Sequence, residues 1–352
     1  MYKYYIFVKH NNMKKIFHNK YIILIPILFL NIISLFYLKN TDYFIKQLSF
    51  TIISYIILII LSNINYKFII KYLKIFYIIT IILLLLVLII GKEINGSKAW
   101  LHILGISIQP SEICKIALIP YLAYLTSKQK NILLIFFLTI IPSILTFIEP
   151  DTGAIIIYLI IFLSELKYLK INKKIIYISL IIITIFISLN IYLYFNNKEL
   201  LINIYGNKLF YRLDRLISFK NQNNIQNTYS LIAIGSHNEM YIPESHNDFI
   251  FASIISKYNF IIFTLIIISY IAIITYYIKY SNKQKNISNI LNYSILNMLL
   301  FQIFYNIFMN LSLLPIIGIP LPFLSYGGSY LIALFSLIGI SINLNKHFNN
   351  KV

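Results

Sequence analysis

Residues 68–90, FIIKYLKIFYIITIILLLLVLII, decide the fold of this chain. They contain no glycine, proline, aspartate or glutamate, and their only charges are two lysines near the start. A helix needs about 20 consecutive apolar residues to cross the hydrocarbon of a bilayer. The run therefore predicts a transmembrane helix and places the chain among integral membrane proteins.

The rest of the chain has the same character. Of its 352 residues, 59% are hydrophobic and only 12% are charged, whereas a soluble domain of this length needs many more charges on its surface. We expect an all-α integral membrane protein with about ten transmembrane helices, in a single polytopic membrane domain over residues 1–352. The predicted spans are 21–38, 47–65, 68–90, 108–126, 131–148, 152–167, 173–195, 249–278, 288–312 and 325–345.

Charge is distributed unequally between the two sides of the predicted domain. Lysines fill the loops on the side of the basic N-terminus, so the positive-inside rule makes that side cytoplasmic and puts both termini there. Most acidic residues, glycines and prolines fall in the opposite loops, of which residues 196–247 form the largest, so we expect an extracytoplasmic working surface. The net charge of +19 reflects these lysines, which do not cluster with stacking aromatics, so no nucleic-acid partner is expected.

The segment 240–253, MYIPESHNDFIFAS, places Glu244, His246 and Asp248 where a polar loop enters a long apolar helix. Ionisable groups are costly near hydrocarbon, so they usually serve chemistry, transport or a structural pairing there. The structural alternative is that Asp248 caps the N-terminus of the following helix.

Other charged residues lie toward the same predicted face. Trp100, the only tryptophan, is expected at interfacial depth. Glu112 and Lys115 are three residues apart, about one turn into a helix that begins at Pro110. They form either an ion pair that ties two helices together or a polar wall for a charged substrate. Asp151, in EPDTGA, either caps the next helix or contacts a substrate or ion.

Arginine and cysteine are rare enough in this chain to be informative. The only arginines, Arg212 and Arg215, are spaced to share one face of an amphipathic helix lying on the membrane. There they bind either phosphate or the headgroups of membrane lipids. The one cysteine, Cys114, excludes an intrachain disulfide and argues against a cysteine-based metal site.

Residues 313–330, LLPIIGIPLPFLSYGGSY, hold three prolines and three glycines, which prevent a regular helix. Irregular backbone at membrane depth is tolerated only where it is buried in protein or lines a cavity. Ser325, Tyr326 and Ser329 are therefore candidates for lining a cavity. A purely structural turn is the alternative.

Taken together and in this order, six motifs resemble those of the bacterial SEDS proteins, the RodA and FtsW group. The resemblance covers about residues 45–345. It implies a SEDS-type bundle of ten transmembrane helices in the bacterial cytoplasmic membrane. The motifs are NGSKAWL, IQPSEICKIAL, EPDTGA, NTYSLIAIGS, PESHNDFIFA and GIPLPFLSYGGSYLIA.

The resemblance also implies an activity. Members of the family are peptidoglycan glycosyltransferases that polymerise lipid II and work in complex with a class B penicillin-binding protein. The essential aspartate of the family's H-(T/N)-D-F-I-F motif matches Asp248. Further matches are Glu112 and Lys115 to the Q-P-S-E-x-x-K pair, Asp151 to the aspartate of Q-P-D-x-G, and Lys46 with Gln47 to a basic-Gln pair.

The implied reaction needs a base and stabilisation of the departing pyrophosphate. As a hypothesis, Asp248 is the base or positions it, and His246 and Glu244 support it. The cations that could hold pyrophosphate are Lys115, Lys46, Arg212 and Arg215. A divalent cation, Mg or Mn, bridging an aspartate to phosphate is a further hypothesis, although the sequence shows no dedicated metal cage.

Two other classes of function compete with the polymerase. A lipid II flippase also needs an outward-facing polar cavity, but its polar groups should reach the inner face, whereas here they concentrate outside. A scaffold would mainly activate the penicillin-binding protein. Short tails favour a RodA-like over an FtsW-like role. Departures from the family pattern are a shortened loop before Pro243, SIISKYNF in place of an acidic pair, and Phe308 in place of a glycine.

Overall fold

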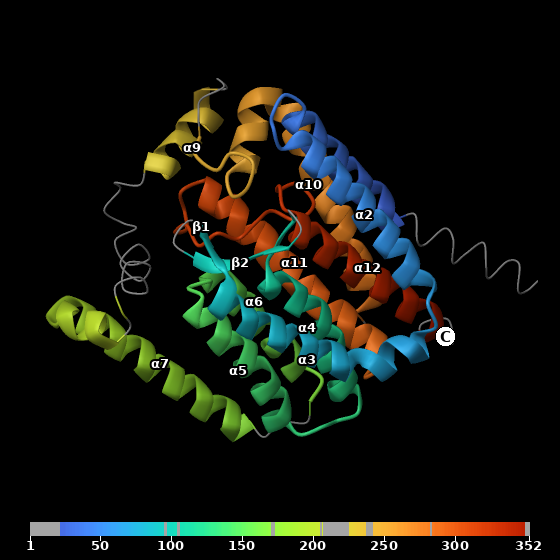
Figure 1. Ribbon diagram of the computed structural model, residues 1–352, viewed down its shortest axis with the longest axis vertical. Helices are drawn as coiled ribbons and strands as arrows, with labels where there is room; N and C mark the ends of the chain where they lie inside the picture. The colour runs from blue at the N-terminus through green and yellow to red at the C-terminus, as the bar shows by residue number, and fades with distance from the viewer. Residues whose placement is uncertain are drawn as a thin grey trace, which may run out of the picture.

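The computed structural model describes residues 22–94, 97–103, 106–169, 173–204, 206, 225–236, 242–281 and 284–348. Within these ranges the protein is predominantly a bundle of helices (Figure 1). Every predicted span corresponds to a helix, and α9 is an additional helix in the large loop. The helices are Ile22–Leu38, α2 (Phe44–Asn63), α3 (Tyr66–Ile90), α4 (Pro110–Ser127), α5 (Ile132–Ile148), α6 (Thr152–Leu166), α7 (Lys173–Asn196), α9 (Ile225–Ser236), α10 (Ile250–Tyr280), α11 (Ile287–Asn310) and α12 (Gly328–Phe348).

Several of these helices have the length and apolarity of membrane spans. Five qualify within the described residues: α2, α3, α11, α12 and the part Ile261–Tyr280 of α10. The helix Ile22–Leu38, α5 and α6 are apolar but shorter. The protein is therefore a multi-pass membrane protein, while ten crossings and two cytoplasmic termini stay predictions.

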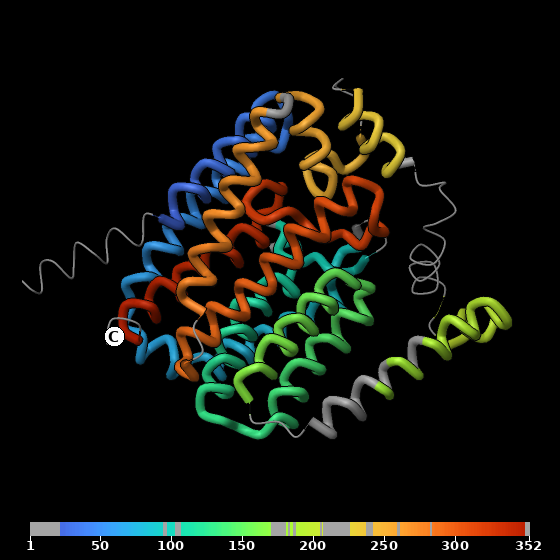
Figure 2. The backbone as a smooth tube through the Cα atoms, turned by 180° about the vertical axis from the view of Figure 1, so that it is seen from behind, coloured from blue at the N-terminus to red at the C-terminus, as the bar shows by residue number. Residues whose placement is uncertain are grey.

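Helices α11 and α12 form the centre of the bundle. Over an apolar stretch of 18 residues, 72% of α11 and 89% of α12 are buried in the protein. The corresponding fractions are only 22% in α2 and 28% in α3, so most residues of these two helices face outward. Figure 2 shows α12 enclosed by segments from both halves of the chain. Gly339 of α12 permits a close approach to α2, because a Cβ there would lie 2.9 Å from the carbonyl oxygen of Leu58.

We expect Gly339→Ala to lower the free energy of unfolding by about 1–3 kcal/mol, the usual cost of overpacking a core. The added methyl group would meet α2 backbone, which has no free rotamer to move away. Gly235→Ala is the matched control, because no atom lies within 4 Å of its Cβ position in α9. Denaturant unfolding in detergent, followed by Trp100 fluorescence, measures the difference. Equal stability of Gly339→Ala and wild type would show that α2 and α12 separate without cost.

The segment between α3 and α4, most of which lies outside the predicted spans, departs from the predicted all-α fold because it forms short strands. Three strands form an antiparallel sheet there, in the order β1 (Lys92–Ile94), β2 (Ser97–Ile103) and β3 (Ile106–Ile108). In β2 the buried Ala99 and Leu101 alternate with more exposed neighbours. This period of two is the signature of a strand, and it is easily missed in a short segment between long apolar runs.

The sheet is fastened to the ends of two helices. Lys98 Nζ donates hydrogen bonds to the carbonyl oxygens of Leu88 (2.8 Å) and Ile89 (3.0 Å), in the last turn of α3. Ser97 Oγ donates to the carbonyl oxygen of Glu149 (2.8 Å), directly after α5. Because β2 is held at both places, Trp100 within this strand has a defined position.

Residues 311–327 are non-helical, as their prolines and glycines predict. The loop is bound to the turn that precedes α10. The amide of Tyr326 donates to the carbonyl oxygen of His246 (2.8 Å), and Ser325 Oγ donates to that of Asn247 (2.7 Å). Two segments about 80 residues apart in sequence therefore meet at one end of the bundle.

Candidate active site

A pocket of about 190 Å³ opens where the turn before α10, the loop before α12 and the first turns of α4 and α6 meet. Its described lining carries four carboxylates and a single cationic side chain, so it is strongly polar in an apolar protein. The charged lining residues are Glu112, Lys115, Asp151, Glu244 and Asp248; the others are Trp100, Gln109, Gly153, Ala154, Ile157, Asn247, Gly318, Pro320, Tyr326, Gly327, Ser329 and Tyr330.

A larger cavity, of about 550 Å³, lies between α3, α12 and the ends of α2 and α4. Its walls are almost entirely apolar, with Ser336 and Tyr72 as the only polar residue types among them. It therefore lacks groups for acid–base chemistry, and the smaller polar pocket is the candidate active site.

Asp248 lies in the turn before α10, is half-buried and lines the pocket. This burial, with a smaller contribution from the charge of Glu244, raises the pKa of Asp248 to about 7. The N-cap position of α10 is occupied by Phe249, and no side chain caps the helix from there. The alternative prediction, that Asp248 is a helix cap, is therefore wrong.

Two residues near Asp248 adopt left-handed backbone. Glu244 has a φ of +58° and Gly318 a φ of +75°. At Gly318 this conformation favours glycine, and a Cβ there would lie 3.7 Å from Asp248 Oδ2. The loop 311–327 thus comes close to the carboxyl group without covering it.

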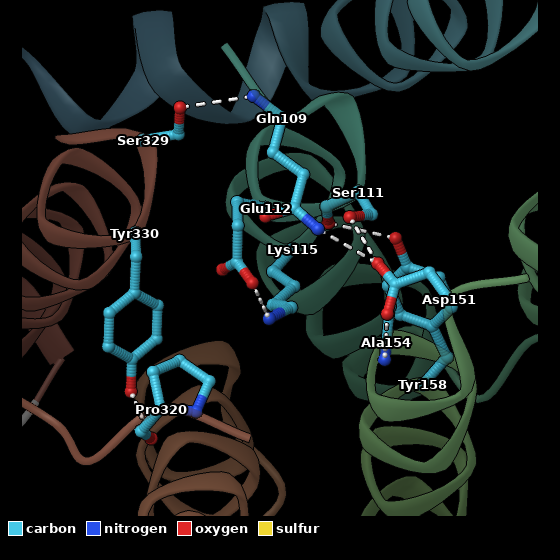
Figure 3. Close-up of polar contacts among 10 residues, drawn as sticks. All are labelled: Gln109, Ser111, Glu112, Lys115, Asp151, Ala154, Tyr158, Pro320, Ser329 and Tyr330. Atoms are coloured by element: carbon cyan, nitrogen blue, oxygen red, sulfur yellow. Dashed lines mark hydrogen bonds and ion pairs between the residues drawn. The ribbon is translucent and has the colours of Figure 1, made fainter. Parts of the chain in front are cut away.

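Glu112 and Lys115 form a buried ion pair at the start of α4 (Figure 3). Lys115 Nζ lies 2.6 Å from Glu112 Oε1 and 5.9 Å from the centroid of the Tyr330 ring. Glu112 Oε2 has no hydrogen-bond partner among the described residues. Because both members are on one helix, the pair does not tie two helices together, and its position in the lining supports the predicted polar wall.

Asp151 joins the beginnings of α4 and α6. Its Oδ1 accepts from the amide of Ala154 (3.1 Å), which confirms the predicted N-cap of α6. Its Oδ2 accepts from Gln109 Nε2 (3.0 Å) and Ser111 Oγ (2.9 Å), as Figure 3 shows. Asp151 also lines the pocket, so capping does not exclude contact with a substrate.

His246 is in the same turn as Asp248 but is absent from the pocket lining. Its ring stacks on Tyr43, with centroids 4.1 Å apart and an interplanar angle of 14°. Burial lowers the pKa of His246, and the nearby carboxylate of Glu244, 3.9 Å from Nε2, opposes that shift. The structure therefore places His246 as a support of the turn rather than in the pocket.

The structure does not bring every predicted site residue to the pocket. Lys46 is exposed on α2, and its neighbour Gln47 is the buried member, within 3.4 Å of the carbonyl oxygen of Ser325. Ser325 Oγ accepts a hydrogen bond from the amide of Leu321 and donates one to the carbonyl oxygen of Asn247. Ser325 does not line the pocket. Arg212 and Arg215 lie outside the described residues.

Sequence reasoning missed several residues of the site. Trp100, expected only at the membrane interface, lines the pocket together with Gln109. Asn306 and Asn310 of α11 donate to the carbonyl oxygen of Asp248, at 2.9 and 3.0 Å. The available signal was asparagine within a predicted membrane helix, since such a side chain requires a hydrogen-bond partner there.

The donor groups do not fit a metal ion held by the protein alone. Within the described part of the chain, no three His, Cys, Asp or Glu side chains come together as ligands. Both carboxyl oxygens of Asp151 already accept hydrogen bonds from the protein. The hypothesis of a divalent cation, Mg or Mn, that bridges an aspartate to phosphate stays a prediction.

The chain is similar to known proteins over nearly its whole length. The model of the FtsW/RodA/SpoVE family, described as cell cycle protein, matches residues 15–350. A probable peptidoglycan glycosyltransferase FtsW of Buchnera aphidicola is 35% identical over 333 residues, covering 87% of this chain and 84% of the relative.

Two solved structures share the fold. One, from a study of how a peptidoglycan synthase complex coordinates polymerization and crosslinking, has a TM-score of 0.79 at 19% identity, covering 93% of this chain and 98% of that one. The Rod shape determining protein RodA of Thermus thermophilus has a TM-score of 0.68 at 19% identity, with 92% and 96% covered. The chain belongs to the FtsW/RodA/SpoVE family of cell cycle proteins.

Proposed function

We propose that this protein is a peptidoglycan glycosyltransferase that polymerises lipid II at the extracytoplasmic face of the bacterial cytoplasmic membrane. One observation carries the proposal: the carboxyl group of Asp248 faces a polar pocket with its pKa near 7. A general base works best when its pKa lies close to the operating pH. Similarity to FtsW, a probable peptidoglycan glycosyltransferase, supports the same reaction.

The reaction is a displacement at the anomeric carbon of a lipid-linked disaccharide. A hydroxyl group of a second lipid-linked sugar attacks that carbon, a new C–O bond forms, and the bond to the lipid pyrophosphate breaks. Asp248 accepts the hydroxyl proton, and the pyrophosphate leaves with the electron pair. Lys115, the one cationic side chain in the described lining, is placed to stabilise the charge of the leaving group.

We also propose a partner and a role. A chain of a peptidoglycan synthase complex that coordinates polymerization and crosslinking shares this fold. This similarity supports a class B penicillin-binding protein as the crosslinking partner. The 35% identity to an FtsW protein supports an FtsW-like role in division over the predicted RodA-like role in elongation, and we propose the division role.

The proposal is tested by incubating the purified protein, alone and with its penicillin-binding partner, with labelled lipid II. We expect glycan chains resolved on a gel when both proteins are present, with a transpeptidase-inactive partner to exclude crosslinking. A parallel assay in liposomes follows the movement of lipid II between leaflets. Movement of lipid II without polymer would replace the polymerase with a flippase, and polymer made only by the partner would leave this protein as a scaffold.

A further inference from the structure

One face of α11 carries three amide side chains at intervals of four residues. Gln302, Asn306 and Asn310 are each 0% exposed. Hydrogen-bonding groups buried in a membrane helix need partners, because neither lipid nor water satisfies them there. Two of the three find their partners in the same short segment, the junction between the turn of Asp248 and α10.

Asn306 and Asn310 hold the backbone of Asp248 from one side. Asn306 Nδ2 lies 2.9 Å from the carbonyl oxygen of Asp248, and Asn310 Nδ2 lies 3.0 Å from it. Asn310 Nδ2 also lies 3.1 Å from Asn306 Oδ1, which ties the two amides to each other. The backbone carbonyl oxygen of Asp248, the proposed base, therefore accepts two hydrogen bonds, which use both of its acceptor positions.

Asn310 also caps α10 from a different helix. The first amides of a helix have no partner within it, and Phe249, at the N-cap, offers no side-chain acceptor. Asn310 Oδ1 accepts from the amide of Ala252 at 3.1 Å. The start of α10, two residues after Asp248, is therefore fixed by α11.

Asn306 also connects the turn of Asp248 to the loop 311–327. Its Nδ2 lies 2.9 Å from the carbonyl oxygen of Ile319 as well as from that of Asp248. Ile319 follows Gly318, the residue whose left-handed backbone approaches Asp248 Oδ2. One amide therefore sets the spacing between the turn of Asp248 and the loop 311–327.

We propose that Asn306 and Asn310 are positioning residues that hold the carboxyl group of Asp248 at its place in the pocket. The expected effect of these residues on the rate of polymerisation rests on the proposed function, whereas their expected effect on the structure of the turn does not. Neither amide lines the pocket, so both act through the backbone of Asp248. A misplacement of about 1 Å in a catalytic group is enough to cost about a hundredfold in rate.

The test compares four variants in the purified full-length protein with its partner. Asn306→Leu and Asn310→Leu remove the amide at similar volume. Asn310→Asp keeps the size of the side chain but loses the donor to Asp248, which guards against a leucine variant that does not fold. Gln302→Leu is the matched control, since Gln302 is equally buried on the same face and has no hydrogen-bond partner among the described residues.

The first readout is hydrogen exchange of the segment 242–253, which needs no activity. We expect the amide of Ala252 to exchange faster in Asn310→Leu, because its acceptor is removed. In Asn310→Asp a carboxyl oxygen still accepts from Ala252, so the faster exchange should lie in the turn 242–249, which has lost a donor. Asn306→Leu should accelerate exchange in the turn 242–249. Gln302→Leu should exchange like wild type in this segment.

The second readout is the dependence of polymerisation on pH. In the Asn306 and Asn310 variants we expect kcat to fall about a hundredfold with little change in KM. In the two leucine variants the acid limb should move to lower pH, because a loosened turn admits water to Asp248 and lowers its pKa. Asn310→Asp is not used for this readout, because its new carboxyl group would itself raise the pKa of Asp248. A purely structural loss would reduce the active fraction without moving that limb. The other titratable groups facing the pocket are Glu244, Glu112, Lys115, Asp151, Tyr326 and Tyr330.

The outcomes separate the inference from the proposed function. Unchanged exchange at 242–253 in the asparagine variants, or equal loosening in Gln302→Leu, overturns the positioning role even if polymerisation is confirmed. Faster exchange only in the asparagine variants supports the role even if wild type makes no polymer. In that case the proposed function fails alone.

Discussion

Asp248→Asn should abolish glycan polymerisation while leaving the protein folded. The two side chains are nearly equal in size, but an amide does not accept the proton of the attacking hydroxyl group. Loss of a general base typically costs about 10²- to 10⁴-fold in rate. We expect a rate at least about a hundredfold below wild type, measured as polymer formed from labelled lipid II by the purified complex. Wild-type activity in this variant would remove Asp248 from the mechanism.

The dependence of the wild-type rate on pH follows from the same carboxyl group. Burial raises the pKa of Asp248 to about 7, and only the ionised form accepts a proton. The value of kcat/KM should therefore fall as pH is lowered through about 7. Glu244→Gln removes the smaller, electrostatic cause of the raised pKa, so its acid limb should lie at lower pH than that of wild type.

Stability should change with pH in the opposite sense to activity. In an unfolded chain the pKa of an aspartate is about 3.9, so folding raises the pKa of Asp248. A raised pKa stabilises the fold while the group is protonated, and this contribution is lost as pH rises from about 4 through about 7. Asp248→Asn stays neutral, so its stability relative to wild type should increase over that window and then remain constant. Denaturant unfolding at several pH values measures this difference.

The membrane helices and the place of Asp248 at a polar boundary were predictable from sequence for the same physical reason. Long apolar runs have one stable form in a bilayer, and an ionisable group at their edge is costly enough to be informative. The same argument placed Glu112 and Lys115 together. Local spacing also predicted the N-cap at Asp151, because a cap depends on residues three apart.

The rest of the site depends on contacts between distant segments, which local patterns do not contain. His246 is two residues from Asp248, yet it stacks on Tyr43 from the turn before α2. Ser325 was a candidate for lining the cavity, but its hydroxyl group donates a hydrogen bond to the carbonyl oxygen of Asn247. Lys46 and Gln47 are neighbours in sequence, but Gln47 lies on the side of α2 that faces the bundle and Lys46 lies on the exposed side.

Phe308, one of the departures from the family pattern, lies on the exposed side of α11. Phe308 lies on α11 between the two positioning residues but points away from them, with 40% of its surface exposed. A large apolar side chain on the lipid-facing side of a membrane helix carries little cost. Phe308, where the resemblance implies a glycine, therefore leaves the hydrogen bonds of Asn306 and Asn310 to Asp248 untouched.

Lys115→Met should have the largest effect on stability, because it leaves Glu112 buried without its partner. The two side chains are only 2% and 8% exposed, and Glu112 Oε2 already lacks a hydrogen bond within the described structure. Removing one member of a buried ion pair typically costs about 3–5 kcal/mol, because the remaining charge is uncompensated. We expect a loss of this size in the free energy of unfolding, measured in detergent.

The double variant Glu112→Gln/Lys115→Met separates the two roles of the lysine. With both charges removed at similar volume, most of the lost stability should return, since a buried pair replaced as a whole is often neutral or stabilising. Polymerisation should not return, because the described lining then carries no cation to stabilise the departing pyrophosphate. Lys46→Met is the control for general loss of positive charge, and its exposed position predicts wild-type activity. If the double variant polymerises like wild type, Lys115 serves only to neutralise Glu112, and the leaving group must be stabilised by other residues.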